Sequence, residues 1–96
     1  MPSAYIIADV DVTNPERYEE YKRLSTIAMK AHGAEVCIRG GQVEVLEGGW
    51  SPKRMVMLKF PSMETARAFN KSVEYSAARK AREGIAVMKM VLVEGV

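Results

Sequence analysis

The chain has one cysteine, Cys37, and one histidine, His32, among its 96 residues. A single cysteine cannot form a disulfide within the chain, and nothing indicates an oxidising compartment. A single histidine without a nearby group of cysteine or acidic residues cannot supply the three or four protein ligands of a zinc-type site. We therefore expect no metal and no cofactor. Cys37 lies between Val36 and Ile38 and is expected to be a buried structural residue.

Long apolar runs and blocks of charge are also missing. No apolar stretch approaches the roughly 18 residues of a membrane-spanning helix, and the first residues lack the basic and apolar segments of a signal peptide. Lys plus Arg number 14 against 12 Asp plus Glu, and at most two basic residues are adjacent, so no basic stripe for nucleic acid is present. We expect one cytoplasmic domain, residues 1–96, that binds neither membrane nor nucleic acid.

The most informative segment runs from Arg39 to Arg54 and reads RGGQVEVLEGGWSPKR. Two Gly-Gly pairs bracket residues 42–47, whose alternating pattern predicts a short, half-exposed hairpin strand. Glycine pairs mark tight turns because glycine tolerates positive φ. The Gly40-Gly41 turn is therefore predicted to be intolerant of bulky substitutes.

Charged residues and one tryptophan accompany these turns. Arg39, Glu47 and Arg54 suit either an Arg–Glu pair that fixes the hairpin or a polar patch at the mouth of a pocket. Trp50 in a glycine-rich loop is more typical of an interface or lid anchor than of a catalytic group. Both alternatives remain open from the residues alone.

Apolar periodicity predicts the remaining elements. A first helix starts at Thr13 or Asn14, with Pro15 in its first turn, and ends at His32-Gly33. At that end His32 is expected to complement the helix dipole. The helix's apolar stripe is Tyr18, Tyr21, Ser25 and Ala28. A second helix starts at Ser62, and a helical pattern resumes over 74–83. We expect the buried stripe of the second helix to be Ala66, Phe69 and Val73. We also expect strands over 4–12, 35–39, 53–60 and 86–94.

This order of strands and helices predicts an α+β fold, a ferredoxin-like βαββαβ sandwich with an extra short hairpin strand. The core strands are apolar at both parities, as in Ile6-Ile7 and Val91-Leu92. Two helices cover only one face of such a sheet, and exposing the other face would cost several kcal/mol at about 25 cal/mol per Å². We therefore expect a homodimer.

Four polar residues, Ser72, Tyr75, Arg79 and Arg82, fall on one helical face. They form either a solvated rim or the border of a pocket, in which an arginine would bind a carboxylate or enolate with both of its terminal nitrogens. The methionines of the core strands, Met55, Met57, Met88 and Met90, suit either core packing or the wall of an apolar cavity.

Spaced motifs over Tyr5 to Gly95 resemble the family called domain of unknown function 1330. They are Pro-Glu-x-Tyr, His-Gly, Arg-Gly-Gly, Glu-Gly-x-Trp-x-Pro-x-Arg, Phe-Pro-Ser and Ser-x-Glu-Tyr followed by Arg82. The resemblance implies a dimeric α/β barrel, a superfamily with small monooxygenases of the antibiotic-biosynthesis type and muconolactone isomerase-like proteins. The family has no established activity, so no catalytic residue is carried over. Ala34 replaces the second glycine of the usual His-Gly-Gly.

Two functions follow as hypotheses. The first is a homodimer that binds a small apolar or aromatic organic acid, with or without cofactor-independent oxygenase or isomerase activity. The second is a non-catalytic structural or ligand-sensing dimer. Whether the chain is an enzyme stays undecided. Tyrosine suits a proton donor or pocket wall better than a base, because its pKa lies near 10. The candidate ligand-binding residues are Tyr75, Arg82, Arg39, Arg54, Tyr18 (or Tyr21) and Ser72.

Overall fold

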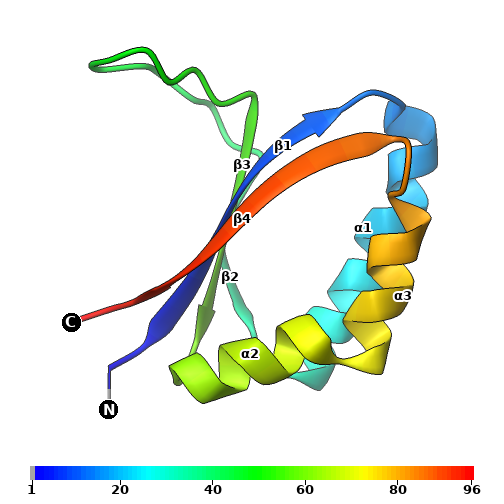
Figure 1. The fold of residues 1–96 in the computed structure, drawn as a ribbon, viewed down its shortest axis with the longest axis vertical. Coiled ribbons are helices and arrows are strands. Elements are labelled where there is room, and N and C mark those ends of the chain that lie inside the picture. The colour runs from blue at the N-terminus through cyan, green and yellow to red at the C-terminus, as the bar shows by residue number, and fades with distance from the viewer. Residues whose placement is uncertain (1) are drawn as a thin grey trace.

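The computed structural model describes residues 2–96, which form one antiparallel sheet with three helices on one face (Figure 1). The elements are, in chain order, β1 (Ala4–Val12), α1 (Pro15–Ala31), β2 (Glu35–Arg39), β3 (Arg54–Phe60), α2 (Met63–Lys71), α3 (Val73–Ala81) and β4 (Ala86–Glu94). The strand order is β2-β3-β1-β4, and every pairing is antiparallel. This confirms the predicted ferredoxin-like α+β fold. No helix among the described residues is long and apolar enough to cross a membrane.

Polar side chains begin each helix. The Asn14 Oδ1 atom accepts a hydrogen bond from the Arg17 amide at 3.1 Å, and Pro15 occupies the first turn, where its missing N–H costs nothing. Asn14 rather than Thr13 is therefore the cap. Ser72 caps α3 by accepting from the Tyr75 amide at 3.1 Å, while its hydroxyl donates to the Phe69 carbonyl of α2 at 2.7 Å.

The break at Ser72 corrects one expectation. The sequence predicts that Val73 continues the buried stripe of the second helix, but Val73 is 84% exposed. Because Ser72 is extended and ends α2, Val73 starts a new helix with a different direction. The buried positions on these helices are Ala66, Phe69, Tyr75 and Ala78.

The core lies between the helices and one face of the sheet. Ile6, Leu58 and Phe60 point from the strands into this layer, and Ala28 and Phe69 meet them from α1 and α2. From Ala4 to Val10 the even-numbered residues of β1 are buried while their odd-numbered neighbours are half-buried, so the two faces of the central strand differ. The helix-covered layer supplies the single apolar interior of the described chain.

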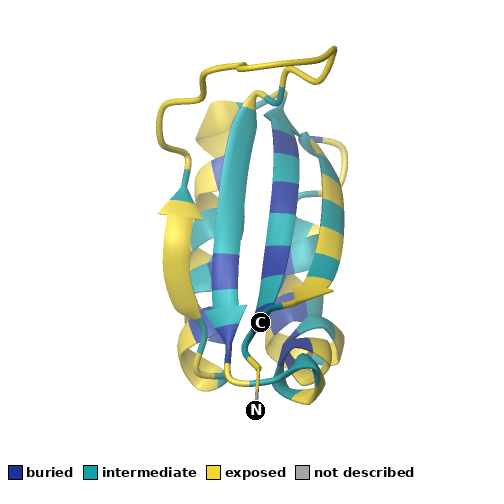
Figure 2. Ribbon diagram, turned by 90° about the vertical axis from the view of Figure 1, so that its left-hand side faces the viewer, coloured by how far each residue is buried: buried dark blue, intermediate teal, exposed yellow. Residues whose placement is uncertain are grey.

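The opposite face of the sheet has no helix over it (Figure 2). The strand register places Ile38, Met57, Ile7 and Val91 side by side in one row across all four strands. Val91 at the β4 edge is 58% exposed. We call this surface the outer face. Its apolar row is the feature that the two-sided strand pattern predicted.

Residues 42–47, predicted to form an extra strand, belong to an exposed loop over 40–53 that leaves the sheet as an arm (Figure 1). A strand here would need a returning partner, but residues 48–53 contain Gly48 at φ +84° and Pro52, which has no amide donor. The arm is tied back to β1 by two contacts. The Trp50 Nε1 atom donates to Asp9 Oδ2 at 3.2 Å, and Lys53 pairs with Asp11 at 3.4 Å.

Cys37 is exposed, which contradicts the expectation that it is buried. The register between β2 and β3 shifts between Val36 and Ile38, so Cys37 occupies an irregularity of the ladder. β2 is also an edge strand, with burial confined to its last residue. Neither the bulge nor the edge position can be read from the apolar neighbours of the cysteine.

Candidate ligand-binding site

Three tyrosines gather in the layer between the sheet and the helices. Tyr18 and Tyr21 lie on successive turns of α1 with ring centroids 5.0 Å apart, and Tyr75 comes from α3. All three residues are buried. The hydroxyl oxygens of Tyr21 and Tyr75 are 2.8 Å apart and share a hydrogen bond. The spacing of the apolar stripe on α1 therefore places two phenol groups beside a third, which comes from a distant segment of the chain.

The hydroxyl pair has only weak acceptors besides itself. The Tyr75 hydroxyl lies 3.6 Å from the Met90 sulfur, and both hydroxyls lie 3.9 Å from the Met88 sulfur. Burial, reinforced by the neighbouring Tyr75 hydroxyl, raises the pKa of Tyr21 far above its ordinary value. Tyr21 is therefore protonated at neutral pH and acts as a hydrogen-bond donor, not as a base.

Three arginines stack on these rings. The Cζ atoms of Arg54, Arg79 and Arg82 lie 5.8, 4.9 and 5.9 Å from the ring centroids of Tyr18, Tyr75 and Tyr21, respectively. Burial raises the pKa of Tyr18, and the Arg54 charge opposes that rise. Stacking of a guanidinium over an aromatic face contributes about 0.5–1 kcal/mol at an exposed site and more where water is excluded.

A fourth arginine, Arg39, reaches α1 from the end of β2. Its Nη2 atom donates to the Thr26 hydroxyl at 2.9 Å and to the Lys22 carbonyl at 3.3 Å. Within residues 2–96 none of the four arginines pairs with a carboxylate. The Nε atoms of Arg54 and Arg82 are buried without a hydrogen-bond partner. The cluster thus holds cationic donors that the described chain does not neutralise.

Gly40 shapes the position of Arg54. Its φ is +76°, and a Cβ atom built there would overlap Arg54 Nη1 and lie 2.8 Å from Arg54 Cζ. Gly41 has no positive φ and would place a Cβ in open space. The predicted intolerance of the glycine turn therefore applies to Gly40 and not to Gly41. Only a glycine at residue 40 lets the guanidinium lie against the backbone.

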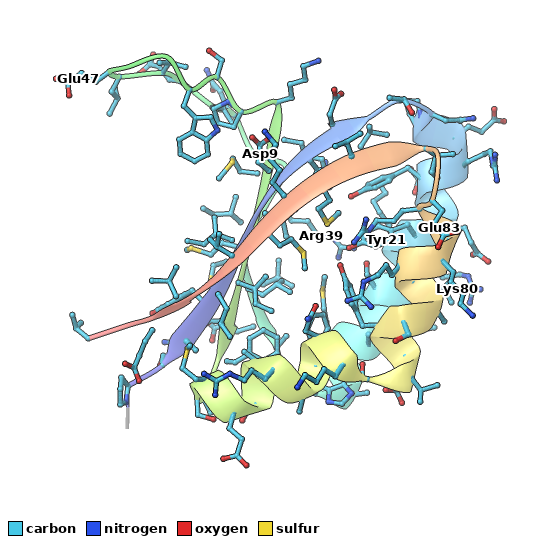
Figure 3. All side chains as sticks on the ribbon, viewed as in Figure 1. Asp9, Tyr21, Arg39, Glu47, Lys80 and Glu83 are labelled. Carbon is cyan, nitrogen blue, oxygen red and sulfur yellow. The ribbon has the colours of Figure 1, made fainter. Side chains whose placement is uncertain are left out.

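A small cavity of about 30 Å³ lies at the centre of this cluster. Its polar lining includes Tyr18, Tyr21, Tyr75, Arg39 and Arg54. Figure 3 shows Tyr21 and Arg39 directed into the space between the sheet and the helices. An open groove of about 620 Å³ runs outside the cavity, and Lys22, Arg39 and Arg54 border both spaces. The two arginines therefore stand at the boundary between interior and solvent.

The candidate residues divide into two groups. Tyr18, Tyr75, Arg39 and Arg54, from four different elements, line the same cavity. Arg82 is not part of its lining but lies against the ring of Tyr21, one layer behind it. The Ser72 hydroxyl is engaged at the junction of α2 and α3.

The structure corrects one other expectation about a polar residue and adds to a second. Glu47 is exposed in the loop, and among residues 2–96 it forms no ion pair with Arg39 or Arg54. His32 caps the end of α1 as expected but also lies 3.1 Å from the Glu74 carboxylate of α3. The second contact joins two helices, which the dipole argument alone did not anticipate.

Sequence reasoning identified neither Lys22 nor Thr26, and it placed Ser25 only on the apolar stripe of the first helix. Ser25 is 1% exposed and lines the cavity, and its place on the stripe with Tyr18 and Tyr21 was the available signal. Lys22 and Thr26 contribute through a backbone carbonyl and a hydroxyl that receive Arg39. Such a contact between β2 and α1 leaves no mark in local sequence.

The family described as Domain of unknown function (DUF1330) matches residues 3–96. No curated protein matches the chain. A solved protein of unknown function from Rhodopseudomonas palustris is similar over 99% of this chain and 83% of its own, with 17% identity and a TM-score of 0.77.

Two further solved structures share the fold. SnoaB, a cofactor-independent oxygenase from Streptomyces nogalater, has 9% identity, a TM-score of 0.61, and coverage of 96% of this chain and 91% of its own. A dimeric protein of unknown function with a ferredoxin-like fold from Bacteroides fragilis has 14% identity, a TM-score of 0.55, and coverage of 97% and 95%. At these identities the similarity establishes the fold alone.

Proposed function

This chain belongs to the DUF1330 family, and we propose that it is a cytoplasmic homodimer that binds a small apolar or aromatic organic acid at the tyrosine–arginine cavity. One observation carries the proposal: Arg39 and Arg54 converge at the cavity mouth without a carboxylate partner among residues 2–96. A cation held in a partly dry site and left unpaired is costly, so an anionic ligand is the natural partner.

The shape of the site agrees with an acid that has an apolar body. A carboxylate at the boundary would meet the two guanidinium groups, each able to present paired N–H donors. The groove outside is open to solvent, so the body of a bound acid would stay partly exposed there. Ile27 and the stems of Lys22 and Arg23 supply its apolar surface.

The binding proposal is tested by calorimetric titration with a panel of aromatic carboxylic acids. We expect Arg54→Ala and Arg39→Ala to weaken binding about tenfold or more, because a charge-assisted contact contributes roughly 1.5–3 kcal/mol. Arg54→Lys should restore little, since an ammonium lacks the planar fork. Arg67→Ala, at an exposed arginine of α2, is the matched control and should bind as the wild type does. Equal losses in Arg67→Ala and Arg54→Ala would refute the site.

Catalysis without a cofactor is the second candidate function. The buried hydroxyl pair of Tyr21 and Tyr75 favours it, because the pair presents protonated donors to the same cavity. Such donors would stabilise negative charge that develops on a substrate oxygen during an oxygenase or isomerase reaction. Turnover of any acid that binds, followed as product formation or oxygen uptake, separates this candidate from a ligand-sensing dimer.

The dimer part of the proposal rests on the outer face. Its row of Ile38, Met57, Ile7 and Val91 is uncovered in one copy, and the Bacteroides fragilis neighbour is itself described as dimeric. Sedimentation at micromolar concentration should give about twice the chain mass of 10.7 kDa. A folded species at the single-chain mass would contradict it.

A further inference from the structure

The Tyr21–Tyr75 pair has one hydroxyl hydrogen that the hydrogen bond between the two residues does not use. Two phenols carry two O–H hydrogens, and the bond between them at 2.8 Å consumes one. The other has only the sulfur atoms of Met88 and Met90, at 3.6–3.9 Å, as protein acceptors. A thioether is a weak acceptor, so a buried donor directed at it is poorly satisfied. The site therefore lacks an oxygen acceptor at this point.

The same cavity joins this donor to the two boundary arginines. Its volume is about 30 Å³, and Tyr21, Tyr75, Arg39 and Arg54 all line it. A space of about 10–15 Å³ by this measure holds one water molecule, so only two or three non-hydrogen atoms fit. A ring does not fit inside, whereas an oxygen attached beside a carboxylate does.

Resting on the acid-binding function proposed above, we propose that the ligand carries an oxygen on the carbon next to its carboxylate. The class is therefore 2-oxo acids and 2-hydroxy acids. The carboxylate lies against Arg39 and Arg54, the neighbouring oxygen enters the cavity and accepts the free hydrogen of the Tyr21–Tyr75 pair, and the hydrocarbon part stays in the outer groove.

Charge and protonation in the cluster support this assignment. Arg82 and Arg79 stack on the rings of Tyr21 and Tyr75, so positive charge lies behind both phenols. The pKa of Tyr21 is raised by burial, which keeps its hydrogen available to a ligand at neutral pH. A pocket for a simple hydrocarbon acid would need neither a polar pair at its closed end nor cations behind it.

The test compares three acids of one skeleton by calorimetric titration. Phenylpyruvate carries the 2-oxo group, 3-phenylpropanoate lacks it, and 3-(4-hydroxyphenyl)propanoate carries an oxygen at the wrong end. We expect the wild type to bind phenylpyruvate about five- to tenfold more tightly than either of the others, the range of one hydrogen bond that satisfies a buried donor. Tyr75→Phe and Tyr21→Phe should each reduce this ratio toward one.

Tyr5→Phe is the matched control, because Tyr5 is on β1 outside the cavity, and it should keep the ratio of the wild type. Thermal melting of each variant reports folding, and the ratio is read within one variant, so a general loss of affinity cancels. A ratio that survives both Tyr21→Phe and Tyr75→Phe would overturn this inference while leaving arginine-dependent acid binding intact. Failure of all three acids to bind the wild type would overturn both proposals.

Discussion

Replacing Gly40 by alanine should damage both stability and ligand binding. At φ +76° an alanine is strained by roughly 1–2 kcal/mol. Its Cβ would also displace the Arg54 guanidinium, which then loses its position over Tyr18, worth about 1 kcal/mol. For a domain of this size each kcal/mol lowers the melting temperature by roughly 4–8 °C.

Two other glycines of the same loop separate these effects. Gly48 has φ +84° but would place a Cβ in open space, so Gly48→Ala should cost at most the backbone strain. Gly41 has neither property, so Gly41→Ala should melt close to the wild type. We expect the order of melting temperatures to be Gly41→Ala, Gly48→Ala and then Gly40→Ala, from highest to lowest.

The assay pairs thermal melting with titration of 3-phenylpropanoate. Only Gly40→Ala should weaken binding, to about the extent of Arg54→Ala, because only this change moves the guanidinium. If Gly40→Ala and Gly48→Ala melt and bind alike, the contact between Gly40 and Arg54 has no role and the reasoning about the cavity mouth is refuted.

The remaining predictions concern the sheet and the helix junction. Val91→Asp should keep the fold but give a single-chain mass in sedimentation, because Val91 is exposed on the outer face. Leu92→Asp should lower the melting temperature by several °C, because Leu92 faces the core. The reverse pattern would show that the two faces of β4 have been assigned wrongly. Hydrogen bonding with His32 lowers the pKa of Glu74 below its ordinary 4.5. The contribution of this contact to the free energy of unfolding is therefore complete above pH 4.5 and is lost as the pH falls through the lowered pKa. In urea unfolding measured across pH 3–6, Glu74→Gln should remove this pH dependence of the unfolding free energy. An unchanged pH profile would show that the contact does not contribute to stability.

The fold was predictable because its signals are local and repeated. The bounds of β1, β2 and β4 follow from apolar runs between turn residues, and the start and end of α1 follow from Asn14 and Gly33. The two-sided apolar pattern of the strands anticipated an uncovered face, and the register then located it. These features depend on near neighbours, which a single sequence records.

The failures share a different cause. Residues 42–47 alternate as a strand should, but a strand also needs a partner, and the glycines and proline that follow provide none. Cys37 has apolar neighbours, yet it lies at a register shift on an edge strand. In both cases the pairing between segments, and not the pattern within one, decided the outcome.

The candidate site could be predicted only in part, because it too depends on how distant segments pack. Tyr18, Tyr75, Arg39 and Arg54 were identified as polar residues beside apolar patterns, but their meeting at one cavity depends on how α1, α3, β2 and β3 pack. Helical spacing places Arg82 on one face with Tyr75. It is one layer removed, because Tyr21 lies between it and the cavity.

The loop over 40–53 lies outside the framework of the sheet and joins two residues of the candidate site. Arg39 is the last residue before the loop and Arg54 is the first residue after it, so both boundary cations are anchored in the sheet while the residues between them are free to vary. Substitutions or insertions at residues 42–49 would leave every strand pairing intact and would not touch the cavity or the groove, because none of these residues pairs in the sheet or lines either space. The arm is therefore a segment whose length and sequence change at little cost to the sheet or to the candidate site.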